Sequence, residues 1–567
     1  MYPNVSLRAL ARHVSAPITA TMLFCLPLTS VNAGGVSPEA LPDAANFTNR
    51  LIVKMAQSPA KGPAISTTEG AQIAVAMSSA SGRTLSFSHQ TGFGAAILKT
   101  TSRMTLPEAA SLAAQIAAQP GVEYAEPDSR MFTMLVPNDT SYPSLWALKP
   151  PTVGNYGINA QTAWDTTTGS ASIVVAVIDT GITNHVDLAG RTVAGYDFIA
   201  DIPTANDTTA RDGDPSDPGD WITSVESTTV GGDYEGCRVT NSSWHGTHVS
   251  GTIGAIGNNS LGVAGINWIS KVQPVRALGK CGGWTSDIAD AITWASGGTV
   301  AGVAANATPA KVINMSLGGT GPCPLSYVNA VNTAVANGTL VVVSAGNSGV
   351  GAAGSRPANC PGVMAVGATA QSGARSVFSS TGSSNYGAPT TISGPGSSIL
   401  STLNTGTTVP VGDTYVNYQG TSMAAPHVAG VASLMLSVRP TLLPHHLAAM
   451  IRGTATAFPS NATRDVDCQI QRCGDGIVNA ASAVAAAQAC AVPPTVGTPA
   501  AISEACNGDL DGNGVVSPLT DGLLAIRLAS GMSGSALTAN ALGACATRTT
   551  YTALRDFMNR NCGTAYP

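Results

Sequence analysis

The sequence predicts an α/β protein with a mostly parallel central sheet flanked by helices. Three apolar, β-branched runs carry this prediction: SIVVAVIDTG (172–181), KVINMSLGG (311–319) and TLVVVSAGN (339–347). Each run is continuously apolar and ends in a turn, as strands buried on both faces of a parallel sheet do. Functional residues of such sheets gather at the carboxyl ends of the strands, where Asp179, Ser316 and Asn347 fall.

Length and composition limit the remaining possibilities. A chain of 567 residues is too long for one compact core, and about three to four domains are expected. Only 10% of the residues are charged, whereas 62 are glycine, which favours tight turns and close packing over disorder. The formal net charge of −5 gives no reason to expect a nucleic-acid partner, which would call for a basic patch.

The first 33 residues have the pattern of a secretory signal peptide. Arg8 and Arg12 precede an apolar run that ends in Val31-Asn32-Ala33, so cleavage is expected after Ala33. The run is short and interrupted by prolines, and no later run reaches the length of a membrane span. We therefore expect a soluble, exported protein without a membrane span.

Cysteine usage agrees with export. Ten of the 11 cysteines follow the signal segment, and an even number in an exported chain indicates disulfide bonds. The short segment CQIQRC suggests a Cys468–Cys473 bond. Sequence order alone suggests two more, Cys237–Cys281 and Cys323–Cys360.

Smaller units flank the predicted sheet. Residues 34–134 contain two strand-like runs and a helix with a Thr105–Glu108 capping box, which predicts a small α+β unit. Residues 135–490 hold the sheet. Residues 491–505 are rich in Pro, Ala, Thr and Ser and indicate a linker, followed by a C-terminal unit, 506–567.

Ser422, in QGTSMAAPHVAG (419–430), is either a nucleophile at a helix start or an ordinary N-cap. A serine nucleophile needs a general base, and the base needs an orienting carboxylate. His427 lies five residues further, about 500° around a helix, and therefore points away. His245 in NSSWHGTHVSGTIG (241–254) is the better candidate, and Asp179 is the candidate carboxylate. His245 and His248 could be a zinc pair, but their HxxH pattern lacks the glutamate and the spacing of the HExxH motif. Asp179, read alone, would be a turn former.

Three separated motifs together resemble the active-site motifs of the subtilisin-like serine peptidases (subtilases): AVIDTGI, HGTHVSGTIG and GTSMAAPHVAG. The resemblance covers roughly residues 135–490 and implies a subtilisin-like fold. It implies that Ser422 is the nucleophile, His245 the general acid/base and Asp179 the orienting carboxylate. VVVSAGNSG resembles the oxyanion segment and implies Asn347 as a side-chain donor, although read alone this asparagine is a turn residue. NMSLGG resembles the strand that pairs with an extended peptide and implies a cleft lined by Ser316, Leu317 and Gly318.

The resemblance also implies a maturation pathway and a function. Residues 34–134 resemble an inhibitory propeptide that acts as an intramolecular chaperone, with cleavage expected between Asp128 and Pro137; the alternative is an unrelated domain that stays attached. The expected function is that of a secreted, monomeric endopeptidase acting on proteins or peptides through an acyl-enzyme. The competing class is a non-catalytic adhesin on a peptidase scaffold, which would predict loss of a catalytic position, and none is lost.

A C-terminal segment indicates a calcium loop. DLDGNGVVSPLTDGLL (509–524) places hard oxygen ligands around a tight glycine turn and resembles a dockerin-like EF-hand loop. The expected ligands are Asp509, Asp511, Asn513 and Asp521. Asp521 stands at the thirteenth place instead of the twelfth, so it serves only if the loop bulges near Pro518; the alternative is a solvated acidic turn.

Two further calcium candidates lie within residues 135–490. NNSLGV (258–263) resembles the structural calcium loop of the family, with Asn259 and Asp187 as expected ligands. RDGDPSDPGDW (211–221) crowds four carboxylates that would repel one another unless they are solvated or share a cation. These are Asp212, Asp214, Asp217 and Asp220. Structural Ca²⁺ is the only cofactor expected.

Overall fold

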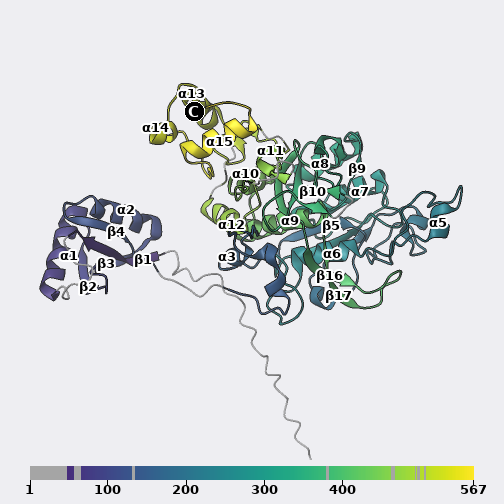
Figure 1. Ribbon diagram of the computed structural model, residues 1–567, viewed down its shortest axis with the longest axis horizontal. Helices are drawn as coiled ribbons and strands as arrows, with labels where there is room; N and C mark the ends of the chain where they lie inside the picture. Colours follow the sequence, from purple (N-terminus) through teal and green to yellow (C-terminus); the bar gives the residue numbers. More distant parts are fainter. Residues whose placement is uncertain are drawn as a thin grey trace, which may run out of the picture. The chain divides into compact units, whose positions relative to one another are not determined.

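The computed structural model describes residues 47–56, 66–129, 135–378, 382–460, 466–491, 493, 498–503 and 506–566. The expected signal peptide lies outside these residues, as do part of the expected linker and part of the segment 128–137 in which cleavage is expected. Figure 1 shows the described elements coloured along the chain.

The N-terminal unit is a four-stranded antiparallel sheet, ordered β2-β3-β1-β4, with two helices. Helix α2 begins with the predicted capping box, since Thr105 Oγ1 accepts from Glu108 N and the Glu108 carboxylate accepts from Thr105 N. Apolar residues of both helices and the sheet form one core. The elements are β1 (Phe47–Met55), α1 (Thr67–Ser81), β2 (Leu85–Gln90), β3 (Ala96–Thr105), α2 (Leu106–Ala117) and β4 (Val122–Pro127).

The predicted central sheet has seven strands in the order β15-β12-β10-β8-β5-β7-β6, and every neighbouring pair is parallel. The three apolar runs of the sequence form adjacent strands β5, β8 and β10, buried along their whole length. The prediction of a parallel α/β sheet is confirmed. The strands are β5 (Val174–Asp179), β6 (Tyr196–Asp197), β7 (Lys271–Arg276), β8 (Val312–Met315), β10 (Leu340–Ser344), β12 (Val363–Thr369) and β15 (Thr390–Pro395).

Helices cover both faces of this sheet (Figure 1). Along β5, Val175 and Val177 belong to one core, whereas Val174, Ala176 and Ile178 belong to the other, as the two-residue period of a strand requires. The first core includes α6 (His245–Gly254), α9 (Thr421–Val438), α10 (Pro444–Gly453) and α12 (Ala480–Ala489). The second includes α7 (Thr285–Ala295) and α8 (Leu325–Ala336).

Helix α9 is the one described helix long and apolar enough to cross a membrane, and 83% of its apolar window is buried inside the protein. It is therefore the central helix of the first core.

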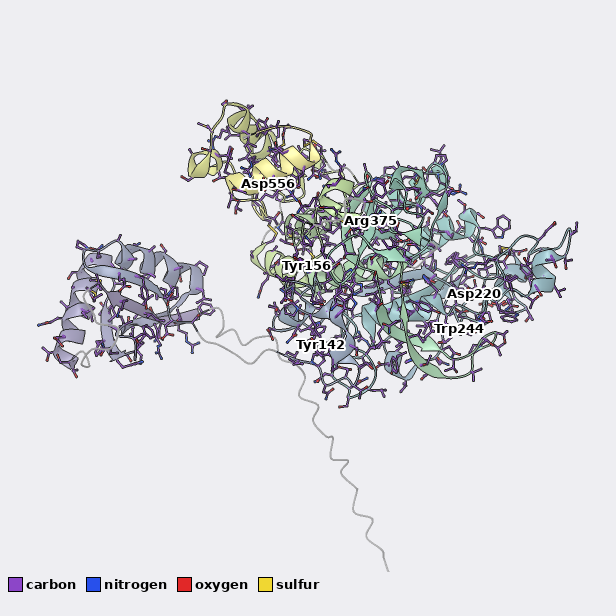
Figure 2. All side chains as sticks on the ribbon, viewed as in Figure 1. Tyr142, Tyr156, Asp220, Trp244, Arg375 and Asp556 are labelled. Atoms are coloured by element: carbon purple, nitrogen blue, oxygen red, sulfur yellow. A yellow bond between two sulfur atoms is a disulfide. The ribbon has the colours of Figure 1, made fainter. Side chains whose placement is uncertain are left out.

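An antiparallel hairpin, β16 (Ile399–Asn404) and β17 (Asp413–Tyr418), packs on α6. Ser401 and Thr402 donate hydrogen bonds to carbonyls of α6. The turn of the hairpin covers Trp244, the residue before α6, whose indole N–H donates to Gly406 O at 2.6 Å (Figure 2). The start of α6 is thereby fixed against the hairpin.

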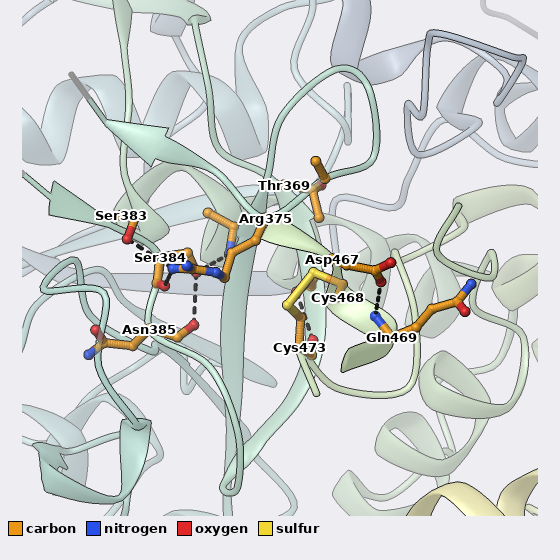
Figure 3. The surroundings of a disulfide bond; sticks show 12 residues. Thr369, Arg375, Ser383, Ser384, Asn385, Asp467, Cys468, Gln469 and Cys473 are labelled. Atoms are coloured by element: carbon orange, nitrogen blue, oxygen red, sulfur yellow. Dashed lines mark hydrogen bonds between the residues drawn. A yellow bond between two sulfur atoms is a disulfide. The ribbon is translucent and has the colours of Figure 1, made fainter. Parts of the chain in front are cut away.

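Five disulfides pair all ten cysteines that follow the signal segment. Cys237–Cys281, Cys323–Cys360 and Cys468–Cys473 are the pairs expected from the sequence. Around the last of these, Asp467 accepts from Gln469 N, and Arg375 donates to Ser384 O (Figure 3). Cys490–Cys545 and Cys506–Cys562 were not predicted, because nothing local in the sequence pairs residues 55 and 56 positions apart.

The C-terminal unit has a small core of its own and a direct covalent link to α12 through Cys490–Cys545. Its helices are α13 (Leu523–Ala529), α14 (Gly534–Thr538) and α15 (Tyr551–Asn561), preceded by a single π-helical turn, η8 (Pro518–Gly522). Shorter elements elsewhere are α3 (Ala160–Trp164), α4 (Ile202–Ala205), α5 (Ser224–Thr228), β9 (Gly319–Thr320), β11 (Ser355–Arg356), β13 (Val377–Phe378), β14 (Gly382–Ser383), α11 (Cys468–Gln471), β18 (Thr498–Pro499) and β19 (Val515–Val516).

Candidate active site

The end of β5 and the start of α6 bring Asp179 against His245. His245 Nδ1 lies 2.8 Å from Asp179 Oδ1 and 3.0 Å from Oδ2, and Asp179 is fully buried. An ionised carboxylate only accepts hydrogen bonds, so Nδ1 carries the proton and Nε2 is left as the basic nitrogen. Asp179 also accepts from Thr180 N at 2.8 Å, which fixes the carboxylate.

The surroundings of His245 favour its charged form. Burial by itself lowers the pKa of His245, but the charge and hydrogen bond of Asp179, together with the charges of Asp220 and Asp217, raise it above its ordinary value of 6.5. A nearby carboxylate therefore stabilises the imidazolium that forms when this ring accepts a proton.

Ser422 lies in the first turn of α9, beside the segment that follows β8. Its hydroxyl donates to Ser316 O at 3.1 Å, and Ser316 Oγ donates to Ser422 O at 2.7 Å. Within the described residues no hydrogen bond joins Ser422 to His245. Ser316, which exchanges these two hydrogen bonds with Ser422, lines the same cleft as His245.

His427, the histidine nearest to Ser422 in sequence, lies in the core. Its ring is 1% exposed, its Nδ1 lies 2.8 Å from Met423 O, and burial lowers its pKa to about 4. His248, three residues after His245, is also fully buried; it stacks on Tyr418, and burial lowers its pKa to about 3.

Asn347 follows β10, and its side chain is held beside the start of α9. Its Oδ1 accepts from Thr421 N at 2.9 Å and from Thr421 Oγ1 at 2.8 Å. Since a backbone N–H requires an acceptor, the amide nitrogen Nδ2 is the group that remains for a ligand. Gly420 has φ +147°, and a Cβ there would lie 3.3 Å from Nδ2, so glycine keeps this approach open.

A cleft of about 580 Å³ runs from His245 along the segment after β8. Ser316, Leu317 and Gly318, the residues expected to contact a peptide, all line it. Gly318 and Gly319 are exposed, so their backbone is accessible to an extended chain.

Within the part of the chain that the structure describes, the four carboxylates of residues 212–220 do not form a convergent acidic cluster, so the expected shared ion stays a prediction. Asp212 and Asp214 each accept from the backbone amide two residues further along the chain. Asp217 accepts from Thr180 Oγ1 at 2.7 Å, and Asp220 accepts from Ser243 N and Oγ. Asp212 and Asp214 thus accept within their own segment, whereas Asp217 and Asp220 accept from residues far away in the sequence.

Asp217 and Asp220 instead support the start of α6. Thr180 Oγ1, which donates to Asp217, accepts from Gly246 N at 3.0 Å. Ser243 Oγ, which donates to Asp220, accepts from His245 N at 3.3 Å. Burial raises the pKa of Asp217 to about 7. Figure 2 labels Asp220 beside Trp244, at the entry to α6.

Asp187 and Asn259 do lie together, and a third residue joins them. Asn259 Nδ2 donates to Asp187 Oδ1 at 2.7 Å, and both Asp187 and Asp139 are buried. Asp139 Oδ2 accepts from Asn258 N, whereas its Oδ1 is buried and has no hydrogen-bond partner in the part of the chain that the structure describes. Burial raises the pKa of both carboxyls, and the charge of Asp187 adds to the rise at Asp139.

The oxygen atoms of Asp139 and Asp187 suit a calcium ion, because a cation would satisfy the unpaired Asp139 oxygen and offset the repulsion. Asn259 turns its Nδ2 toward Asp187, while its Oδ1 accepts from Leu261 N at 2.9 Å. Sequence reasoning missed Asp139. It stands in an ordinary loop 48 positions before Asp187, within no motif, and only its burial without a partner identifies it.

The C-terminal carboxylates Asp509, Asp511 and Asp521 converge, with ligand atoms within 4.8 Å of one another. All three are buried, and so is Asn513. The loop gains its extra residue through the π-helical turn η8, where Gly522 N donates to Ser517 O. Burial raises the pKa of Asp511 to about 7, and the charges of Asp521 and Asp509 add to the rise.

Comparison with known proteins agrees with this geometry. A family model described as the subtilase family matches residues 170–479. The extracellular protease of Xanthomonas campestris pv. campestris is 44% identical over 478 residues, which cover 84% of this chain and 78% of that protein. The extracellular basic protease of Dichelobacter nodosus is 38% identical over 487 residues, covering 85% and 77%. A solved protease structure from Pseudoalteromonas arctica is 46% identical, covers 62% of this chain and 100% of that one, and superposes with a TM-score of 0.57.

Proposed function

The chain belongs to the subtilase family and is a subtilisin-like serine protease, and from this premise we propose that Asp179, His245 and Ser422 are its catalytic triad. The observation that carries the assignment is the hydrogen bond that His245 Nδ1 donates to the fully buried carboxylate of Asp179. That bond fixes the tautomer with Nε2 free to accept the serine proton.

In this mechanism Ser422 Oγ attacks the scissile carbonyl while His245 Nε2 takes its proton. Asp179 stabilises the imidazolium, and His245 then protonates the leaving amine. Asn347 Nδ2 and the backbone N–H of Ser422 hold the oxyanion. The clamp of Thr421 on Asn347 Oδ1 supports this role, because it fixes Nδ2 before the reaction starts. Water then hydrolyses the acyl-enzyme.

The substrate is a protein or peptide bound in extended form. Its backbone pairs with Ser316–Gly318, where Gly318 leaves the main chain exposed. Because Gly318 has no Cβ, a second chain can approach its backbone closely, and a side chain at this position would hinder that approach.

The proposed maturation follows the order of the chain. Residues 1–33 direct export, 34–134 form the inhibitory propeptide, 135–490 the catalytic domain, 491–505 a linker and 506–567 a dockerin-like module. The names of the two relatives, both extracellular proteases, support secretion. The mature enzyme acts as a monomer, and nothing in its composition suggests nucleic acid as a partner.

Calcium has a structural role in this proposal. Asp139, Asp187 and Asn259 would hold one ion in the catalytic domain, and a second would be held in the C-terminal module by Asp509, Asp511, Asn513 and Asp521. The supporting observations are the orphaned oxygen of Asp139 and the convergence of three buried carboxylates in the module. Each ion would neutralise buried negative charge and cross-link loops.

A casein-clearing assay on the secreted protein tests the mechanism. We expect Ser422→Ala to abolish clearing while the protein is still secreted. Ser437→Ala, near the end of the same helix, is the matched control and should clear casein as the wild type does. Undiminished clearing by Ser422→Ala would refute the assignment.

A further inference from the structure

An arginine, Arg356, is one of the residues that line the cleft. Arg356 belongs to β11, which pairs antiparallel with β9, so that Arg356 lies opposite Gly319. A Cβ on Gly319 would lie 3.5 Å from Arg356 Nε, which places the arginine side chain against bare backbone. Arg356 and His245 line the same cleft.

The charge of Arg356 has no counter-ion in the described part of the chain. Arg211 pairs with two aspartates, and Arg276 does the same. Arg356 has neither a carboxylate within 4.0 Å nor a side-chain hydrogen bond among the described residues. A guanidinium stays charged at any pH at which the protein is folded. Solvent or a bound molecule must therefore balance its positive charge.

The other charged groups that line the cleft do not neutralise it. Asp220 directs both of its oxygens to Ser243, next to His245. Arg238 is a second arginine on the lining and is exposed. Among the residues that line the cleft, two arginines thus stand against one carboxylate.

The spacing of residues along the cleft gives the distance between Ser422 and Arg356. Ser316 exchanges two hydrogen bonds with Ser422, and Gly319 lies three residues further along. At about 3.3 Å per residue of extended chain, this separation is about 10 Å. A peptide strand that pairs with Ser316–Gly319 thus brings a side chain to Arg356 about three residues from its scissile bond.

We propose that Arg356 selects substrates with an acidic side chain about three residues from the scissile bond. The inference rests on the proposed function, because it assumes that a peptide lies extended in this cleft. A guanidinium presents parallel N–H donors that a carboxylate accepts in a bidentate geometry.

Tyr327 lines the same cleft, and the charge of Arg356 acts on its hydroxyl. Burial raises the pKa of Tyr327, and a hydrogen bond with Thr285 and the charge of Arg356 only partly oppose the rise. The hydroxyl therefore remains protonated at neutral pH and can donate to the same carboxylate.

The test uses the mature, secreted enzyme and internally quenched peptides that differ only in glutamate or glutamine at each position within four residues of the scissile bond. We expect kcat/KM to be about two- to fivefold higher for glutamate at one position about three residues away, the size of a partly exposed ion pair. Arg356→Gln should remove this ratio. Arg238→Gln, which removes the same charge from the same cleft, should keep it.

The outcomes separate this inference from the proposed function. Equal rates for glutamate and glutamine at every position would overturn it, and so would equal loss of the preference in both arginine variants, which would indicate a long-range field. If no peptide is cleaved, the proposed function fails; fluorescence anisotropy with Ser422→Ala then decides the inference. Tighter binding of the glutamate peptide that depends on Arg356 supports it, and equal binding of both peptides refutes it.

Discussion

Substitution of Asp187 by asparagine should abolish the contribution of calcium to the stability of the catalytic domain. Asp187 and Asp139 are buried carboxylates that repel each other, and one Asp139 oxygen has no hydrogen-bond partner among the described residues. Bound calcium would relieve both penalties. Asparagine keeps the size of the side chain and removes the charge on which the ion depends.

The magnitude follows from mass action. At a calcium concentration of about 100 times Kd, one site contributes about 2.7 kcal/mol to the free energy of unfolding. In a domain of this size, a change of about 1 kcal/mol in the free energy of unfolding moves the midpoint of thermal unfolding, Tm, by about 2 °C. The site should therefore account for about 5 °C in Tm. Wild-type protein should therefore lose about this much in Tm on chelation, beyond any loss from the C-terminal module.

Differential scanning calorimetry with calcium or a chelator measures this difference. The Ser422→Ala background prevents self-digestion during the scan. Asp509→Asn combined with Asp511→Asn removes the C-terminal cluster, so that the response that remains belongs to the catalytic domain. Asp187→Asn should then show no calcium response. If Asp187→Asn retains the full 5 °C shift, which is about the value expected for one site, the assignment of this ion is wrong.

Four further predictions concern catalysis and the C-terminal module. Asn347→Ala should lower kcat by about 10²–10³-fold with little change in KM, because an oxyanion donor acts mainly in the transition state; an unchanged kcat would exclude the role. The ascending limb of kcat/KM against pH should lie above 6.5, because activity needs neutral His245 and its pKa is raised. Asp217→Asn should move this limb a few tenths of a pH unit lower, since a negative charge that favours the imidazolium is lost; a move to higher pH contradicts the sign. Replacing Cys490 and Cys545 by serine should lower the free energy of unfolding of the module by up to about 4 kcal/mol, because the bond closes a loop of 55 residues. Limited proteolysis should then release the module, and resistance equal to that of the wild type would show that the bond adds no stability.

The central fold could be predicted from the sequence because its signals are local. Continuous β-branched runs form β5, β8 and β10, and no charged residue interrupts them until each strand ends. The capping box of α2 follows from two residues three positions apart. The order of strands in the sheet was not predicted, because it depends on crossover connections that no local pattern encodes.

For the candidate site, too, the sequence could indicate some features and not others. Asp179, His245, Asn347 and Ser422 stand in motifs, so their identity could be proposed from the sequence. The hydrogen bonds that orient them could not be, since Asp179 and His245 are 66 positions apart and Asn347 and Thr421 are 74 apart.

Tertiary structure decided what each remaining acidic or basic group does. The sequence crowded four aspartates into residues 212–220 and suggested one ion, yet the fold directs Asp217 and Asp220 to the start of α6. It placed Asp521 one position late, and a π-helical turn brings that carboxylate back into the cluster. Arg356 and Asp139 carry no motif at all. Their significance comes from what surrounds them, because burial and the absence of a partner are properties of the folded chain, whereas strand and helix patterns are properties of neighbouring residues.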